Sequence, residues 1–213
     1  MTSPTSATSP STTRHRVPLT APLILASSSP RRRRLLDRVG IEAEVRPITI
    51  DEETIEGEAP EEYVRRVVRQ KLEAALEAAA GEASFVMTGD TAVVVDGVVL
   101  GKPATAKENA EMISALSGRA HLVLSSVALG REGRVLGVRS AQTQVVFRRV
   151  TAAEVDRYVA TAEGADKAGG YALQGIAGGF VERIDGTYGT VVGLPLMETL
   201  ELLRAHGVVE AWP

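Results

Sequence analysis

Apolar and polar positions at the start of the chain predict a buried strand followed directly by a helix. Residues 22–26, PLILA, form a short apolar run bounded by proline and by three serines, which is typical of a buried strand. Ser29 suits the N-cap of a helix, Pro30 suits its first position, and Gly40 can close it. The next segment, 41–50, alternates like a half-buried strand and leads into the acidic run DEE.

A long amphipathic helix is predicted from about Pro60 to Ala80, and one position breaks its pattern. Val67 and Ala75 belong to an apolar stripe at helical spacing, and Lys71 lies in the middle of it. A lysine there costs free energy unless it snorkels to solvent or meets an anion. We therefore expect replacement of Lys71 by Met to weaken anion binding and to leave the ligand-free protein as stable or more so, because it replaces a poorly placed charge with an apolar chain.

The second half of the chain predicts hairpins, antiparallel strands and helices that begin at capping boxes. Segment 84–103 indicates a strand, a turn around Gly89-Asp90, and a hairpin with a type I′ turn at Asp96-Gly97. Capping boxes at Thr105 and Thr151 each start a helix. Further expected elements are strands at 121–129, 134–138 and 141–150, two strand-like runs within 168–195, and a helix from about 195 to 206.

Composition is that of one soluble globular unit. The 213 residues are 44% hydrophobic and carry a net charge of -3, which argues against a general polyanion binder. The absence of cysteine excludes disulfides and thiolate metal sites. Residues 1–21, rich in Ser, Thr and Pro, are expected to form a disordered tail, and 22–213 one mixed α/β unit.

The tail and the rest of the chain lack membrane signals. No stretch approaches the roughly 20 apolar residues of a spanning helix, and the tail lacks a secretory apolar core. We therefore expect a cytoplasmic protein with no membrane partner. A transit peptide is the alternative, because the tail carries Arg14 and Arg16 and no acidic residue.

The stretch LASSSPRRRRLL, residues 25–36, is a candidate anion site. A strand that enters a helix through small residues exposes backbone N–H groups and the positive end of the helix dipole. Arg31 and Arg32 lie in the first turn, where that dipole disfavours cations, so a bound anion would offset their cost. An ordinary arginine-rich helix surface is the alternative, and we favour it for Arg33 and Arg34.

Other chemical signals are weaker singly. Asp90 follows a glycine, Glu52 stands in the acidic run, and the Gly-Lys-Pro setting of Lys102 would aim its side chain. The three histidines have neither metal-ligand spacing nor a Ser-His-Asp order. No Walker-type loop occurs.

Four motifs in order resemble the Maf family of nucleoside triphosphate pyrophosphatases, over residues 23–206. They are LASSSPRRRRLL, DEE followed by PEEYVRRVVRQKLEAA, GDTAVVVDGVVLGKP, and GGYALQGIAGGFVERIDGTYGTVVGLPL. The resemblance implies hydrolysis between the α and β phosphates with a divalent metal, Mg²⁺ or Mn²⁺. It also implies a mixed twisted sheet flanked by helices, a cleft between two lobes as in inosine triphosphate pyrophosphatases, and a homodimer.

The resemblance implies a site, residue by residue. The implied catalytic residues are Asp90, Glu52, Lys71 and Lys102, and the implied substrate-binding residues are Ser27, Arg31, Arg32, Thr91 and Gln174. Asp90 resembles the family's proton acceptor, with Asp90 and Glu52 as implied metal ligands. The lysines and arginines would neutralise phosphate charge in the transition state.

Three positions resemble the branch that prefers dTTP and UTP: Arg31, Thr91 and Gln174. The branch that acts on 7-methyl-GTP has an aromatic in place of Arg31 and Glu in place of Gln174. A Gln amide can both donate to and accept from a pyrimidine edge, as an ionised Glu cannot. One departure is TGDT, where the family more often has GADT. It keeps the aspartate and threonine, but the resemblance does not define the turn expected there.

The resulting expectation is a house-cleaning enzyme that removes dTTP, UTP and modified pyrimidine triphosphates. One alternative is a regulator of septum formation and cell division that uses nucleotide binding as its signal. Another is a nucleic-acid-binding module built on the arginine run. We do not expect a nucleic-acid partner, because no aromatic-rich basic face accompanies the run and the net charge is negative.

Overall fold

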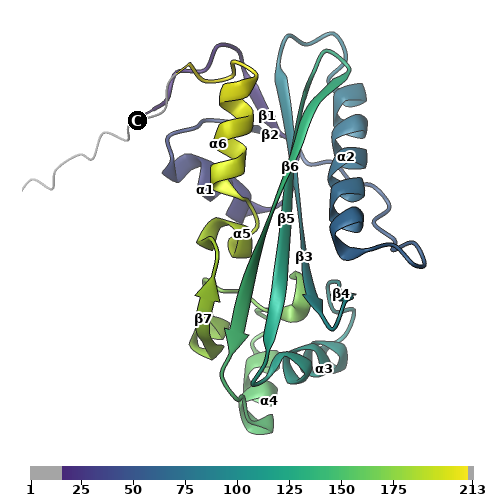
Figure 1. Cartoon of the computed structure of the whole chain (residues 1–213), viewed down its shortest axis with the longest axis vertical. Helices are drawn as coiled ribbons and strands as arrows, with labels where there is room; N and C mark the ends of the chain where they lie inside the picture. Colours follow the sequence, from purple (N-terminus) through teal and green to yellow (C-terminus); the bar gives the residue numbers. More distant parts are fainter. Residues whose placement is uncertain (1–15, 211–213) are drawn as a thin grey trace, which may run out of the picture.

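Three long antiparallel strands form the middle of the protein and run along most of its length (Figure 1). They are β3 (Phe85–Val95), β5 (Ala120–Arg131) and β6 (Arg134–Phe147). The computed structural model describes residues 16–210. Within them the sheet has seven strands in the order β2-β1-β3-β5-β6-β7, with β4 paired to β3.

The shorter strands complete a mixed sheet. They are β1 (Leu23–Leu25), β2 (Glu44–Val45), β4 (Val98–Leu100) and β7 (Val181–Asp185). Strand β1 pairs in parallel with both β2 and β3, whereas the other pairings are antiparallel. The expected α/β class with a mixed central sheet is confirmed.

Helices lie on both sides of this sheet (Figure 1). They are α1 (Pro30–Arg38), α2 (Pro60–Ala78), α3 (Ala106–Leu116), α4 (Ala152–Ala160), α5 (Tyr188–Val192) and α6 (Leu196–Ala205), with 3₁₀ turns η1 (Ala168–Gly170) and η2 (Ile176–Phe180). Helix α2 covers one side, and α1, α5 and α6 lie on the other (Figure 1). In the described part of the chain, no helix is both long and apolar enough to cross a membrane.

Two large apolar clusters occupy opposite ends of the long strands. One packs α1 and α6 against β1, with Leu25, Leu36 and Leu203 buried. The other packs α3 and α4 against the far ends of β5 and β6, around Phe147 and Tyr158. These clusters are the cores of two lobes that share the sheet, so side chains in the middle of β3 lie between them.

The predicted helices form nearly where expected, because their end signals are local. Pro30 starts α1, and Gly40 follows it with a φ of 76°. Ser29 is extended as an N-cap should be, but its side chain makes no capping hydrogen bond. At α4, by contrast, both hydrogen bonds of the predicted capping box at Thr151 are present.

Several predicted strand boundaries are wrong. Strand β3 continues through Gly89-Asp90 without a turn, because both residues pair across the sheet with β5. Segments 134–138 and 141–147 are one strand, β6, because pairing with β5 continues across residues 139 and 140. Only two residues of 41–50 form a strand, and the glycine-rich stretch contains one strand, β7.

The expected tail boundary at residue 21 is also wrong. Residues 1–15 lie outside the described residues. Val17 is buried and its N–H donates to the Gly40 carbonyl, while Leu19 forms a β-bridge with Val209. These two apolar side chains are enough to pack the segment against the first core cluster.

Candidate active site

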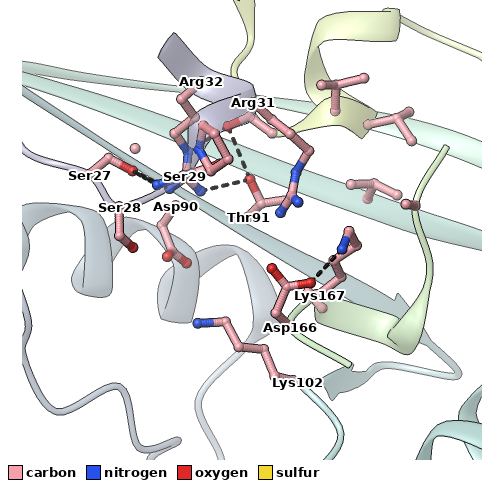
Figure 2. A pocket seen from close by; sticks show the side chains of 18 of the residues that line it. Ser27, Ser28, Ser29, Arg31, Arg32, Asp90, Thr91, Lys102, Asp166 and Lys167 are labelled. Carbon is pink, nitrogen blue, oxygen red and sulfur yellow. Dashed lines mark hydrogen bonds and ion pairs between the residues drawn. The ribbon is translucent and has the colours of Figure 1, made fainter. Parts of the chain in front are cut away.

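One cavity of about 290 Å³ lies between the lobes, and all nine residues of the implied site line it. Figure 2 labels Ser27, Arg31, Arg32, Asp90, Thr91 and Lys102 among them. They are Ser27, Arg31, Arg32, Glu52, Lys71, Asp90, Thr91, Lys102 and Gln174. These residues come from segments that are up to 147 positions apart in the chain, from 27 to 174. Strands β1 and β3 are neighbours in the sheet. Helix α1, which follows β1, and Asp90, in the middle of β3, therefore lie side by side.

The start of α1 forms one wall of the cavity around Arg32. Its Nε donates to the Gly193 carbonyl at 2.8 Å, Nη1 to Ser27 Oγ at 2.9 Å, and Nη2 to Thr91 Oγ1 at 3.3 Å. Desolvation lowers the pKa of Arg32 and the nearby Asp90 raises it, yet a guanidinium keeps its charge at neutral pH. Arg32 is therefore held as a fixed cation.

The glycine before Asp90 has a steric reason in this wall. A Cβ on Gly89 would lie 2.9 Å from Arg32 Nε, closer than side chains pack. The strand can thus pass directly beneath the guanidinium only because residue 89 lacks a side chain.

The other arginines of the run divide as expected. Arg31 lines the cavity, and in the range 16–210 its side chain has no hydrogen bond or ion pair. Arg33 and Arg34 are exposed, and Arg33 Nε lies 3.8 Å from Asp37 Oδ2 one turn along the helix. The surface interpretation is confirmed for Arg33 and Arg34.

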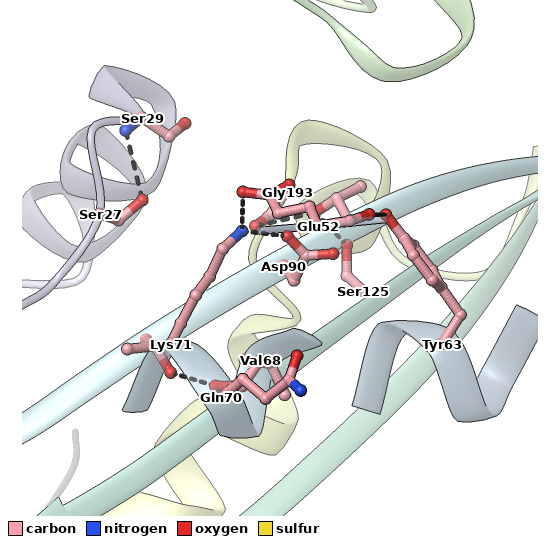
Figure 3. Close-up of polar contacts among 12 residues, drawn as sticks. Ser27, Ser29, Glu52, Tyr63, Val68, Gln70, Lys71, Asp90, Ser125 and Gly193 are labelled. Carbon is pink, nitrogen blue, oxygen red and sulfur yellow. Dashed lines mark hydrogen bonds and ion pairs between the residues drawn. The ribbon is translucent and has the colours of Figure 1, made fainter. Parts of the chain in front are cut away.

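Lys71 joins two carboxylates at the centre of the cavity wall (Figure 3). Its Nζ lies 2.6 Å from Asp90 Oδ1 and 2.8 Å from Glu52 Oε1. The lysine and Asp90 are 8% and 6% exposed, so this is a buried pair, whereas Glu52 is partly open to solvent. Lys71 therefore meets anions within the apolar stripe, and the snorkelling alternative is wrong.

Burial raises the pKa of Asp90, and Glu52 adds to that rise. Lys71 and Arg32 oppose it by stabilising the charged form. A carboxylate whose pKa is raised is a better proton acceptor once ionised, because its basicity is closer to that of the group it must deprotonate.

Glu52 reaches the cavity from a loop rather than from the strand end that the alternation predicted. The loop is tied to α2 by two hydrogen bonds. Tyr63 Oη donates to the Glu52 carbonyl at 3.1 Å, and Arg66 Nη2 donates to the Glu53 carbonyl at 3.0 Å. Arg66 is itself paired with Glu58 at 2.6 Å, so the loop has a defined path.

The opposite rim carries Lys102 and a pair that sequence reasoning missed, Asp166 and Lys167 (Figure 2). The backbone beside Lys102 is fixed because the Gly169 N–H donates to the Gly101 carbonyl at 3.0 Å. Lys167 pairs with Asp166, which lowers the Asp166 pKa, and Arg31 lowers it further. The only available signal was the charged dipeptide directly before the glycine-rich motif.

Uncharged side chains line another part of the cavity: Tyr171, Leu173, Gln174, Val191 and Val192. The cavity therefore combines cationic side chains suited to phosphates with uncharged ones suited to a planar, partly apolar group.

The carboxylates fit a divalent cation only in part. Across residues 16–210, no group of three or more Asp, Glu or His side chains is placed to hold a metal ion. Mg²⁺ commonly uses one or two carboxylates together with substrate phosphates and waters. Glu52 and Asp90 are oxygen donors of that kind, so they fit a cation that arrives with a phosphate substrate.

Known proteins are similar in sequence to this chain over nearly its whole length. Residues 22–206 match the family model described as Maf-like protein. A dTTP/UTP pyrophosphatase of Anaeromyxobacter dehalogenans (strain 2CP-1 / ATCC BAA-258) is 47% identical over 193 residues, which cover 89% of this chain and 96% of the relative. A dTTP/UTP pyrophosphatase of Sphingopyxis alaskensis is 46% identical over 188 residues, covering 87% and 97%.

Among solved structures, the chain is similar to a nucleoside-triphosphatase / dITP/XTP pyrophosphatase from Mycobacterium abscessus. That likeness covers 60% of this chain and 74% of the other, with 18% identity and a TM-score of 0.38.

Proposed function

The chain belongs to the Maf family, and from this membership and the cavity we propose that it hydrolyses dTTP and UTP to the monophosphate and pyrophosphate. The relatives that share 46 and 47% of its residues are named for that activity. Modified pyrimidine triphosphates are substrates of the same class. Removal of such nucleotides from the cytoplasmic pool is the house-cleaning role that we propose.

One observation carries the proposal. A buried Lys71–Asp90 pair lies in the same cavity as the fixed cation Arg32 and the guanidinium of Arg31, which has no ion pair among the described residues. Each of these charged side chains loses hydration in the cavity, which costs free energy. A polyanionic ligand would offset that cost, and a protein that binds none would have no benefit from this arrangement. A triphosphate would neutralise the cations and supply an electrophilic phosphorus beside a carboxylate.

The reaction assigns distinct tasks to these residues. Water attacks the α-phosphorus, the bond from that phosphorus to the bridging oxygen breaks, and pyrophosphate leaves. Asp90 accepts the proton of the attacking water, while Lys71 holds the carboxylate in position. Arg31, Arg32 and Lys102 stabilise the charge that develops on the phosphate oxygens.

We assign Glu52 and Asp90 as the residues that would hold a divalent metal. Mg²⁺ or Mn²⁺ bound there would withdraw charge from the phosphate oxygens and favour attack at phosphorus. Lys71 contacts the same two carboxylates and would share them with the cation.

Pyrophosphate release from a nucleotide panel tests the proposal. With Mg²⁺ present, we expect release from dTTP and UTP and much less from purine triphosphates and 7-methyl-GTP. Chelation by EDTA should abolish release, and added Mg²⁺ or Mn²⁺ should restore it. A protein that binds these nucleotides without releasing pyrophosphate would instead support the alternative role as a nucleotide-dependent regulator of septum formation.

A further inference from the structure

Gln174, one of the uncharged side chains that line the cavity, is held by a residue outside it. Its Nε2 donates to Tyr188 Oη at 2.6 Å, and no other hydrogen bond involves this amide within residues 16–210. Tyr188 is not among the lining residues, and it is 43% exposed. Tyr188 therefore contacts the glutamine from behind.

The hydrogen bond to Tyr188 uses one of the two N–H groups of the Gln174 amide. A glutamine amide has two N–H donors and one carbonyl acceptor, so one N–H and the carbonyl stay available. Uracil and thymine present one ring N–H between two carbonyl oxygens, which is the complementary pattern. A free glutamine side chain must lose torsional freedom to make such a pair, and a restrained one has already lost part of it.

Tyr188 is itself fixed, because it begins the short helix α5. At the start of α5, the Thr187 N–H donates to Thr143 Oγ1 on β6 at 3.0 Å. Within it, the Thr190 carbonyl accepts from Ser125 Oγ on β5 at 2.8 Å. A Cβ on Gly189 would lie 2.6 Å from the Leu194 carbonyl, so the chain that follows the helix packs closely against its first turn.

The other end of α5 reaches the phosphate-binding wall. The carbonyl of Gly193, directly after the helix, accepts from Arg32 Nε at 2.8 Å. Ser125 Oγ, which holds the Thr190 carbonyl, also lies 2.8 Å from Thr91 Oγ1. The five-residue helix α5 thus links Tyr188, which holds Gln174, to Arg32.

We propose that Tyr188 is a positioning residue for nucleobase recognition, and that α5 sets the separation between the base-reading Gln174 and the phosphate-binding Arg32. This inference rests on the proposed function, because it concerns the same cavity. Tyr188 acts through Gln174 and contacts no reacting atom.

A double-mutant cycle on Tyr188→Phe and Gln174→Ala tests this inference. The Phe variant keeps the exposed ring and removes only the hydroxyl. For dTTP and UTP we expect KM to rise about three- to tenfold, the range of one lost hydrogen bond, with kcat changed less than about twofold. In the Gln174→Ala background, removal of the hydroxyl should have no further effect.

Two binding measurements make the outcome independent of turnover. A non-hydrolysable α,β-imido analogue of dUTP should bind the Tyr188→Phe variant more weakly by the same factor in calorimetry. Inorganic triphosphate, which has no base, should bind the variant and the wild type equally.

Each result bears on a separate claim. Unchanged KM and analogue affinity in Tyr188→Phe, with normal hydrolysis of dTTP by the wild type, would overturn the inference and leave the proposed function standing. Equal effects of the substitution in both backgrounds would show a general structural role instead. A wild type that binds the analogue but releases no pyrophosphate would overturn the enzyme function, and the binding cycle would still decide the role of Tyr188.

Discussion

Lys71 Nζ lies 2.6 Å from Asp90 Oδ1, and both side chains are buried in the wall of one cavity. The lysine comes from α2 and the aspartate from the middle of β3, so the contact forms only when the helix packs on the sheet. Either group alone would be a costly buried charge, whereas together they satisfy one another. Their shared position beside Arg32 makes the pair the centre of the candidate site.

Asp90→Asn should lower kcat by roughly 10²-fold or more, the usual contribution of a general base. Asn cannot accept the proton of water, so the general base is lost. The fold should be retained, because Asn has nearly the same volume, its Oδ1 can still accept a hydrogen bond from Lys71, and Glu52 stays as the ion-pair partner of that lysine. Steady-state pyrophosphate release, together with circular dichroism and thermal unfolding, measures both effects. Near-normal turnover in a folded variant would remove Asp90 from the mechanism.

Lys71→Met should destabilise the ligand-free protein, contrary to the expectation for an unpaired lysine. The substitution leaves Asp90 without its ion pair, and breaking a buried pair typically costs about 3 to 5 kcal/mol unless the remaining group becomes neutral. Urea unfolding at neutral pH measures the loss. Lys107→Met, at an exposed position on α3, is the matched control and should change stability little.

The loss in Lys71→Met should also depend on pH. Removal of the lysine takes away a group that opposes the burial-raised pKa of Asp90, so this pKa should rise further. An acid with a raised folded-state pKa destabilises the fold as pH rises, because the buried charged form is disfavoured. We therefore expect a larger loss at pH 8 than at pH 5, and a loss independent of pH would contradict the pairing.

Arg32→Lys should reduce kcat/KM by about 10- to 100-fold although the charge is kept. The Nε and both Nη atoms of Arg32 each reach a different acceptor, and a lysine ammonium cannot reproduce this planar fork. Arg34→Lys, at an exposed position on the same helix, should leave kcat/KM within about twofold. If Arg32→Lys and Arg34→Lys changed kcat/KM equally, the positive charge of residue 32 would suffice and the planar fork of its guanidinium would not be needed.

His121 should make the protein less stable below pH 6.5. Burial lowers its pKa to about 4, and its Nε2 lies 2.9 Å from Tyr171 Oη. As pH decreases, His121 thus binds a proton near pH 6.5 in the unfolded chain but only near pH 4 in the folded protein. Between these values, stability falls as pH decreases.

Urea unfolding at pH 7 and pH 5 measures this effect. The wild type should lose roughly 2 kcal/mol more than His121→Phe over this interval, given a cost of about 1.4 kcal/mol for each pKa unit. The phenylalanine fits an aromatic cluster that already contains Phe147, whose ring centroid lies 5.0 Å from that of His121. Equal losses in the two proteins would show that His121 charges freely in the fold.

Local chemistry made much of this protein predictable. Pro30, Gly40 and the capping box at Thr151 mark helix ends through bonds to near neighbours in the chain, so those ends were identified correctly. The type I′ signal at Asp96-Gly97 was likewise correct, since both residues have positive φ values. All nine site residues that the motifs implied line the cavity, whereas Asp166 and Lys167 on its rim were not predicted.

Strand limits depended on partners that are distant in the chain. Gly89-Asp90 has the composition of a turn, yet the strand continues because β5 lies alongside it and pairs with both residues. Segment 41–50 has a strand-like alternation, yet only Glu44 and Val45 find a partner in β1. Periodicity reports which face a residue prefers, and pairing requires a neighbour that the local pattern does not contain.

The sequence by itself determined the motif set, the conflict at Lys71 and five of the six α-helices that the structure describes in residues 16–210, because each follows from residues close together in the chain. Helix α5 lies in a stretch where strand-like runs were expected. Only the tertiary structure decided how that conflict is resolved, since Asp90 and Glu52 reach the lysine after α2 packs on β3 and the 51–53 loop docks on α2. It also placed Tyr188 behind Gln174 and Asp166 on the rim. Contacts of this kind depend on packing across the sheet, where free energy comes from burial and geometry rather than from local propensity.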